Sequence, residues 1–274
     1  MQFGILGRLE VSKDGQLIEV KGAKQRALLT LLLLHPNQTV SKDGIIDALW
    51  GEGLSGREAA TLRVHVAHLR QALQPLSQDR PDLIITRPPG YLLSVDPDAI
   101  DANRFERLAL EGRRLLSDDP ERAEERLRAA LGMWRGPALE EVSYELFAEG
   151  EARRLEELRL SALEDLFEAR LARDSDHELV GELESLLAVH PLRERLWGHL
   201  MLGLYRSGRQ ADALRAYRRI ANHLGELGLE PGPQLRQLED RILVNDPMLI
   251  RAGTGPHSAG PAVPGSGPDG AGHG

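Results

Sequence analysis

The stretch Ala59–Leu73 constrains this chain most, because its apolar residues recur with the spacing of one helix face. At about 100° per residue they form a narrow stripe of the kind that docks a helix on a core. The stripe consists of Leu62, Val66, Leu69 and Leu73. The sequence therefore predicts an amphipathic helix whose opposite face is free to meet a partner.

The outward face of this predicted helix is basic, polar or small, and Ala59–Leu73 contains no carboxylate. Small and short polar side chains can approach base edges in the major groove of DNA, while long arginines reach phosphates. The outward residues are Thr61, Val64, Ala67, His68 and Gln71, with Arg63 and Arg70 on one flank. A solvated helix that happens to be basic is the alternative that this stretch alone leaves open.

The segments on either side of this helix predict a winged helix-turn-helix. Val40–Trp50 is typical of a short helix with Ser41 as its N-cap, and the glycine-rich 51–56 connects it to the longer helix. Downstream, Leu83–Val95 indicates two short apolar strands around the turn Arg87-Pro-Pro-Gly. Helix, turn, helix and hairpin follow one another in the order of that domain.

Three further basic side chains are candidates for DNA contact. Arg87 at the hairpin tip could enter the adjacent minor groove, where the potential is most negative. Lys24 and Arg26, in the first turn of a predicted helix at Ala23–His35, could reach phosphates. The plainer alternatives are an exposed turn arginine for Arg87 and solvated cations for the other two.

The remaining segments complete the predicted architecture. Phe3–Val11 and Leu17–Val20 alternate around Asp14-Gly15 and predict a hairpin at the edge of a small antiparallel sheet. From Asp101 to Leu243 the pattern is helical, and Leu192–Tyr217 looks like a tetratricopeptide-type hairpin. The helices are expected at 101–116, 120–134, 144–172, 176–190, 192–207, 209–224 and 232–243.

The fold class is therefore an α+β winged helix-turn-helix domain followed by an all-α, tetratricopeptide-like domain. We expect the first domain at residues 1–98, the second at 99–245, and a disordered tail at 246–274 that is rich in Gly and Pro.

Charge and composition limit the class of partner. The net charge is −8, but the first 98 residues hold 11 basic and 11 acidic residues, so the second half carries the whole excess of acid. A neutral domain neutralises few phosphates and binds DNA weakly as a single copy, so two copies side by side would help. The absence of cysteine and of a membrane-spanning or secretory segment favours a cytoplasmic protein without membrane contact.

No catalytic constellation is found. Acidic pairs such as Glu140 with Glu141 lie on predicted helix surfaces without a histidine or an apolar enclosure. His177, His190 and His199 lack metal-ligand spacing, and no glycine-rich phosphate loop is present. We expect neither enzymatic activity, nor a metal, nor a cofactor.

Several motifs occur in the order of a known family. They are MQFGILGRLEV at the start, AKQRALLTLLLLHPNQTVS, TLRVHVAHLRQAL, TRPPGYLLSV, WRGPAL from Trp134, HPLRERLWGHLMLGLYRSGRQADALRAYRRI from His190, and LGLEPGPQL from Leu227. Over about residues 1–245 the chain resembles the Streptomyces antibiotic regulatory proteins. These are activators with an OmpR-type winged helix followed by a bacterial transcriptional activation domain.

The resemblance implies which side chains face DNA: Thr61, Arg63, Val64, His68 and Arg70, with Gln71 beside them and Arg87 on the wing. At Trp50, related winged helices can lay an aromatic ring against the DNA backbone; core packing is the alternative. Relatives commonly carry arginine where this chain has His68, and a neutral imidazole would be a weaker reader of bases.

The resemblance also implies an activator that binds direct repeats at promoters as a homodimer, recruits RNA polymerase holoenzyme and controls secondary metabolism. The connection 51–57 corresponds to a loop that faces RNA polymerase in the resembling proteins. The alternative function is a peptide- or ligand-binding adaptor, in which the helical repeats are the main surface and the winged helix makes protein contacts. The neutral charge of the first domain and His68 keep that alternative open.

Overall fold

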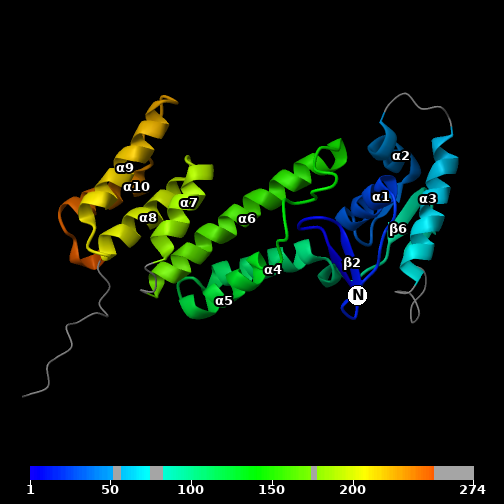
Figure 1. Ribbon diagram of the computed structural model, residues 1–274, viewed down its shortest axis with the longest axis horizontal. Coiled ribbons are helices and arrows are strands. Elements are labelled where there is room, and N and C mark those ends of the chain that lie inside the picture. Colours follow the sequence, from blue (N-terminus) through cyan, green and yellow to red (C-terminus); the bar gives the residue numbers. More distant parts are fainter. Residues whose placement is uncertain (52–56, 75–82, 174–177, 250–274) are drawn as a thin grey trace, which may run out of the picture. The chain divides into compact units, whose positions relative to one another are not determined.

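The computed structural model describes residues 1–51, 57–74, 83–173 and 178–249, in two compact units that divide between residues 175 and 176. The first unit contains both small sheets, the helices α1 to α3, and three further helices, α4 to α6 (Figure 1). The contacts thus continue well past residue 98. The division of the chain into domains at residues 1–98, 99–245 and 246–274 stays a prediction.

The first sheet is antiparallel and has the order β1-β2-β3, with β1 at Gln2–Gly4, β2 at Glu10–Lys13 and β3 at Gln16–Leu17. The predicted turn at Asp14-Gly15 joins β2 to β3, but the prediction of one strand over Phe3–Val11 was wrong. Phe3 pairs with Val11 across the sheet, and the chain reverses between them through Gly7, whose φ of +137° suits glycine.

The winged helix has α1 at its centre. Residues 27–33 of this helix are all buried, because neighbours cover the helix on most sides. A second sheet has the order β4-β6-β5, so the predicted hairpin gains a third strand. The elements are α1 (Ala23–Leu34), β4 (Thr39–Ser41), α2 (Lys42–Trp50), α3 (Glu58–Leu73), β5 (Ile84–Arg87) and β6 (Gly90–Leu93).

The helical half begins after the short 3-10 helix η2 (Pro97–Ala99). In the first unit α4 packs on α5, and both pack on α6 (Figure 1). In the second unit α8 and α9 form a hairpin around Ser207 and Gly208. Trp197 and Ala213 are buried, as the predicted pattern requires, whereas Ala211 is exposed and departs from that pattern. The helices are α4 (Asp101–Leu115), α5 (Pro120–Leu131), α6 (Leu146–Ala172), α7 (Leu179–Val189), α8 (Glu194–Arg206), α9 (Gln210–Gly225) and α10 (Pro233–Leu243).

The end of the described chain belongs to the second unit. The 3-10 helix η3 (Pro247–Leu249) buries Leu249, whose carbonyl accepts a 2.9 Å hydrogen bond from Nε of Arg206. The rest of the predicted tail, 250–274, lies outside the described residues. Within the part of the chain that the structure describes, no helix is long and apolar enough to cross a membrane.

Candidate nucleic-acid interface

The helix α3 presents the surface that the sequence predicted. Its buried residues are Leu62, Val66, Leu69 and Leu73, the predicted stripe without exception. The outward residues Thr61, Arg63, Val64, Ala67, His68 and Gln71 are all exposed. The helix begins one residue earlier than predicted, at Glu58, so a carboxylate does lie in its first turn. From Thr61 to Gln71 the outward face carries no acid.

The buried side of α3 is held by α1 and α2, and α3 lies at the edge of the first unit (Figure 1). At the start of α2 the hydroxyl of Ser41 accepts a 3.0 Å hydrogen bond from the backbone N–H of Gly44, which confirms the predicted N-cap. At its end Trp50 is half-buried and stacks on His65 of α3, with 5.9 Å between ring centroids. The ring of Trp50 therefore packs between the two helices.

The connection between α2 and α3 was predicted to face RNA polymerase. Its residues 52–56 lie outside the described residues, so that expectation has no structural counterpart here.

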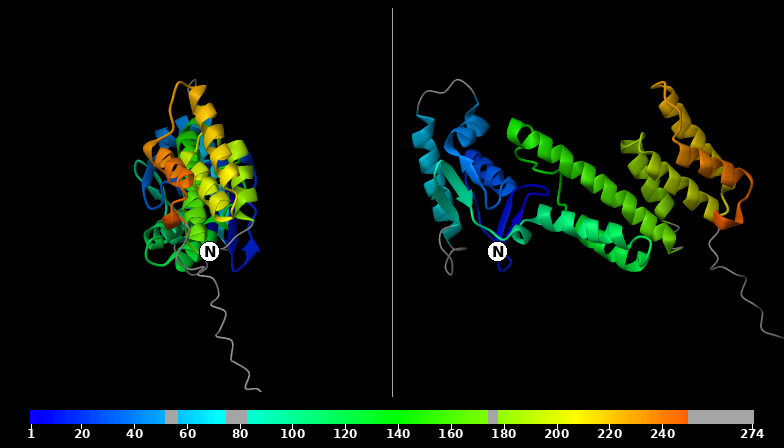
Figure 2. Two further views of the ribbon diagram at one scale, coloured as in Figure 1. Left: turned by 90° about the vertical axis from the view of Figure 1, so that its left-hand side faces the viewer. Right: turned by 180° about the vertical axis from the view of Figure 1, so that it is seen from behind.

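Arg70 joins α3 to the wing, which is the hairpin of β5 and β6. Its Nε donates to the carbonyl of Ile84 at 2.9 Å, and an Nη donates to the hydroxyl of Thr86 at 2.8 Å; both acceptors belong to β5. Seen from behind in Figure 2, the hairpin of β5 and β6 runs alongside α3. Arg70 was predicted to contact DNA alone, yet part of its guanidinium fixes the wing against α3.

The wing presents Arg87 at the end of β5, and this side chain is exposed beside Pro88 and Pro89. Its position pairs with Gly90 across the hairpin, and Gly90 in turn pairs with Ser41 of β4. The tip of the wing is thereby anchored on the segment that caps α2. Arg87 is thus an accessible cation on the same unit as the outward face of α3.

Lys24 and Arg26 have protein partners, although we expected them to reach phosphates or solvent. The ammonium of Lys24 donates to the carbonyl of Leu49, at the end of α2. The guanidinium of Arg26 forms a 3.0 Å ion pair with Glu141 and is two-thirds buried. Long-range partners such as Glu141 leave no mark in the local sequence, which is why the two cations looked free.

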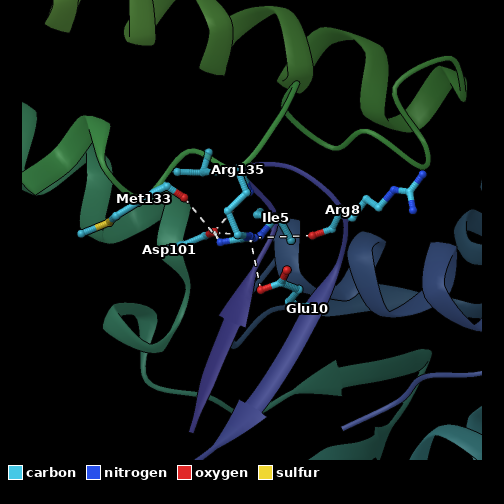
Figure 3. A network of polar contacts seen from close by, with 7 residues as sticks. Ile5, Arg8, Glu10, Asp101, Met133 and Arg135 are labelled. Carbon is cyan, nitrogen blue, oxygen red and sulfur yellow. Dashed lines mark hydrogen bonds and ion pairs between the residues drawn. The ribbon is translucent and has the colours of Figure 1, made fainter. Parts of the chain in front are cut away.

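A polar network around the buried Asp101 fastens the N-terminal sheet to α4 (Figure 3). The carboxylate of Asp101 accepts hydrogen bonds from the backbone N–H groups of Ile5 at 2.8 Å and Leu6 at 3.2 Å. Arg135 pairs with Asp101 at 3.0 Å and with Glu10 at 3.3 Å. The network ties the sheet beside the winged helix to the helical half.

The segment after Arg135 extends this attachment. The backbone N–H of Arg135 donates to the carbonyl of Leu6, and that of Leu139 donates to the carbonyl of Ile5. Arg8 adds a 3.1 Å ion pair to Glu140. The motif WRGPAL, which carries part of the family resemblance, therefore also has a structural role that the sequence pattern did not predict. The sequence signal for this attachment was Asp101, the first residue of the helix that follows the wing.

We expect acid to destabilise the first unit through His65. Burial lowers the pKa of this imidazole below its usual 6.5, and the charges of His68 and Lys24 lower it further. The unfolded chain therefore binds the proton more readily, so this stabilisation is complete above pH 6.5 and is lost as the pH falls through the lower folded pKa. The urea midpoint of the parent chain should be lower at pH 5 than at pH 7, and this difference should be smaller in His65→Phe. An equal difference in both proteins would contradict the role of His65.

The comparisons with known proteins match both parts of the chain. The family model "Transcriptional regulatory protein, C terminal" covers residues 17–93, and "Bacterial transcriptional activator domain" covers residues 100–243. The transcriptional regulator RedD of Streptomyces coelicolor is 37% identical over 252 residues, which are 91% of this chain and 72% of RedD. This chain belongs to the Streptomyces antibiotic regulatory protein family. It is a member of a family of transcriptional regulators with an OmpR-type domain and an activation domain.

Two further relatives of this family member are longer. The regulatory protein AfsR of S. coelicolor is 38% identical over 91% of this chain, which corresponds to 25% of AfsR. A solved structure of Mycobacterium tuberculosis EmbR, described as a complex with a low-affinity phosphopeptide, matches with a TM-score of 0.84 and 37% identity. That match covers 89% of this chain and 65% of the EmbR chain. The arrangement of a winged helix followed by helices is thus shared with EmbR.

Proposed function

We propose that this family member is a sequence-specific, DNA-binding activator of transcription without enzymatic activity. The observation that carries the proposal is the outward face of α3, which is exposed and free of acid from Thr61 to Gln71. On the same unit the wing presents the exposed Arg87. Such a helix can enter a major groove, and the wing arginine can enter the adjacent minor groove.

The side chains of this face suit the two kinds of contact that DNA recognition needs. Val64 is 51% exposed although it is apolar, and Ala67 beside it is small. Apolar contact with the methyl group of thymine is a use for such residues in a major groove. Thr61 and Gln71 supply short polar groups, and Arg63 on the flank can reach a phosphate.

Assembly on promoter DNA completes the proposal. Since residues 1–98 have no net charge, one copy neutralises few phosphates, and two copies on a direct repeat would double the number of contacts. The helical half would support this homodimer and recruit RNA polymerase holoenzyme. Membership of the family supports control of a secondary-metabolite pathway, with the protein in the cytoplasm and on the nucleoid when bound.

A second candidate function is supported by a different surface. In the second unit several large apolar side chains are exposed, as a peptide- or ligand-binding adaptor would require: Leu227, Leu229, Leu243, Val244 and Met248. An adaptor whose winged helix makes protein contacts would show no salt-sensitive binding to DNA. The acid-free face of α3 favours the first candidate.

Arg63 gives the cleaner test of DNA contact, because replacing Arg70 would also release the wing from α3. Arg63→Ala should weaken binding to specific and random duplexes alike, since a phosphate contact carries no sequence information. The slope of log affinity against log salt should become shallower by about 1. Fluorescence anisotropy of the full-length chain at several salt concentrations measures both quantities.

Two variants serve as controls for this experiment. Arg63→Lys keeps the charge and should keep the slope. Arg218→Ala removes an exposed arginine from α9 in the second unit and should leave binding to DNA unchanged. An Arg63→Ala protein with the affinity and the salt slope of the parent chain would refute a phosphate contact at this position.

A further inference from the structure

His68, on the outward face of α3, is held by a side chain from another helix. The amide Nε2 of Gln25, in the first turn of α1, lies 3.1 Å from Nδ1 of His68. His68 is exposed, while Gln25 is half-buried at the place where α1 packs on α3. One ring nitrogen of His68 therefore faces α1, and the other, Nε2, is left for a partner outside the protein.

This contact determines what the free nitrogen of His68 can do. The amide Nε2 of Gln25 is a hydrogen-bond donor, so this contact favours the His68 tautomer in which Nδ1 accepts and the ring hydrogen lies on Nε2. His68 thus offers a hydrogen-bond donor in a fixed orientation, where a free histidine could offer a donor or an acceptor.

We propose that Gln25 is a specificity-determining positioning residue, which fixes His68 so that Nε2–H donates to a purine N7 in the major groove. The proposal rests on the proposed DNA-binding function. N7 of guanine and of adenine is an acceptor on the major-groove edge, whereas the cytosine amino group is a donor and would repel Nε2–H. The Gln25–His68 pair would restore part of the base selectivity that a freely rotating imidazole lacks.

The test compares base preferences of full-length variants. Random duplex DNA is selected with the parent chain, with His68→Ala and with Gln25→Leu, which keeps the approximate size of the side chain but cannot donate. Both variants should lose preference at the same base pair by about 3- to 10-fold, the worth of one hydrogen bond. Gln16→Leu, an exposed glutamine of β3, is the matched control and should keep every preference.

A base analogue identifies the acceptor. Replacing the purine at that base pair by its 7-deaza form removes N7, so the parent chain should lose affinity for the duplex. Gln25→Leu and His68→Ala already lack the contact, so the replacement should lower their affinity little further.

Enrichment of a motif by the parent chain, with all its preferences kept in Gln25→Leu, would overturn the positioning role but leave the DNA-binding function intact. Insensitivity of the parent chain to the 7-deaza purine would overturn the proposed N7 contact. Failure of the parent chain to enrich any motif would instead refute the proposed function.

Discussion

Replacing Asp101 with Ala is expected to lower the free energy of unfolding of the first unit by about 3–5 kcal/mol. The side chain of Asp101 is 3% exposed, and its two oxygens accept the N–H groups of Ile5 and Leu6. The substitution would leave both donors without an acceptor and would remove an ion-pair partner of Arg135. The loss is large because a buried donor without a partner costs its full desolvation energy.

Urea denaturation of the full-length chain measures the loss, and amide hydrogen exchange of the N-terminal segment locates it at Ile5 and Leu6. Asp98→Ala is the matched control, because Asp98 is 57% exposed and pairs at the surface with Arg107. A change within about 0.5 kcal/mol is expected there. If the two substitutions prove equally mild, the network around Asp101 does not hold the N-terminal sheet to α4.

The second large effect is expected for Gly90→Ala in the wing. A Cβ at Gly90 would overlap the carbonyl oxygen of Val40 and lie 2.6 Å from its carbonyl carbon. The neighbour is backbone of β4, which cannot move aside without breaking the pairing of β4 with β6. We expect a loss of stability of about 1–3 kcal/mol or more from this overpacking, together with weaker binding to DNA because Arg87 is displaced.

Thermal denaturation and anisotropy on duplex DNA measure the two consequences of Gly90→Ala. Gly150→Ala is the control in the same unit: this glycine lies in α6 with nothing within 4 Å of an added Cβ. Alanine is the better helix former, so that variant should be more stable by about 0.5–1 kcal/mol. Equal melting temperatures for the two variants would show that the wing tolerates a side chain at Gly90.

The sequence was sufficient to predict what depends on local periodicity. The apolar stripe of α3 and the hairpin around Pro88-Pro89 follow from spacing and turn chemistry within a few residues. The helices of the second half were predicted within about three residues for the same reason. Family motifs added the function that the resemblance implies for these parts, which periodicity alone does not give.

Partners far apart in sequence could not be predicted. Asp101 accepts hydrogen bonds from Ile5 and Leu6, which lie 96 and 95 positions earlier in the chain. Arg26 pairs with Glu141, which is also distant in the chain, so no local pattern shows either contact. The double use of Arg70 was missed for the same reason, since its acceptors lie on β5. The reversal of the chain between Phe3 and Val11 was hidden by an alternation of residues that also suits a single strand.

The proposed binding of DNA by α3 and the wing can be tested by one selection experiment. Random duplex DNA is selected with the full-length chain, and the winning sequence is titrated by anisotropy at two salt concentrations. We expect enrichment of a tandem direct repeat that binds more weakly as salt rises, because phosphate contacts release counterions. Selection without any enriched sequence, or binding that salt does not affect, would contradict it and favour the adaptor.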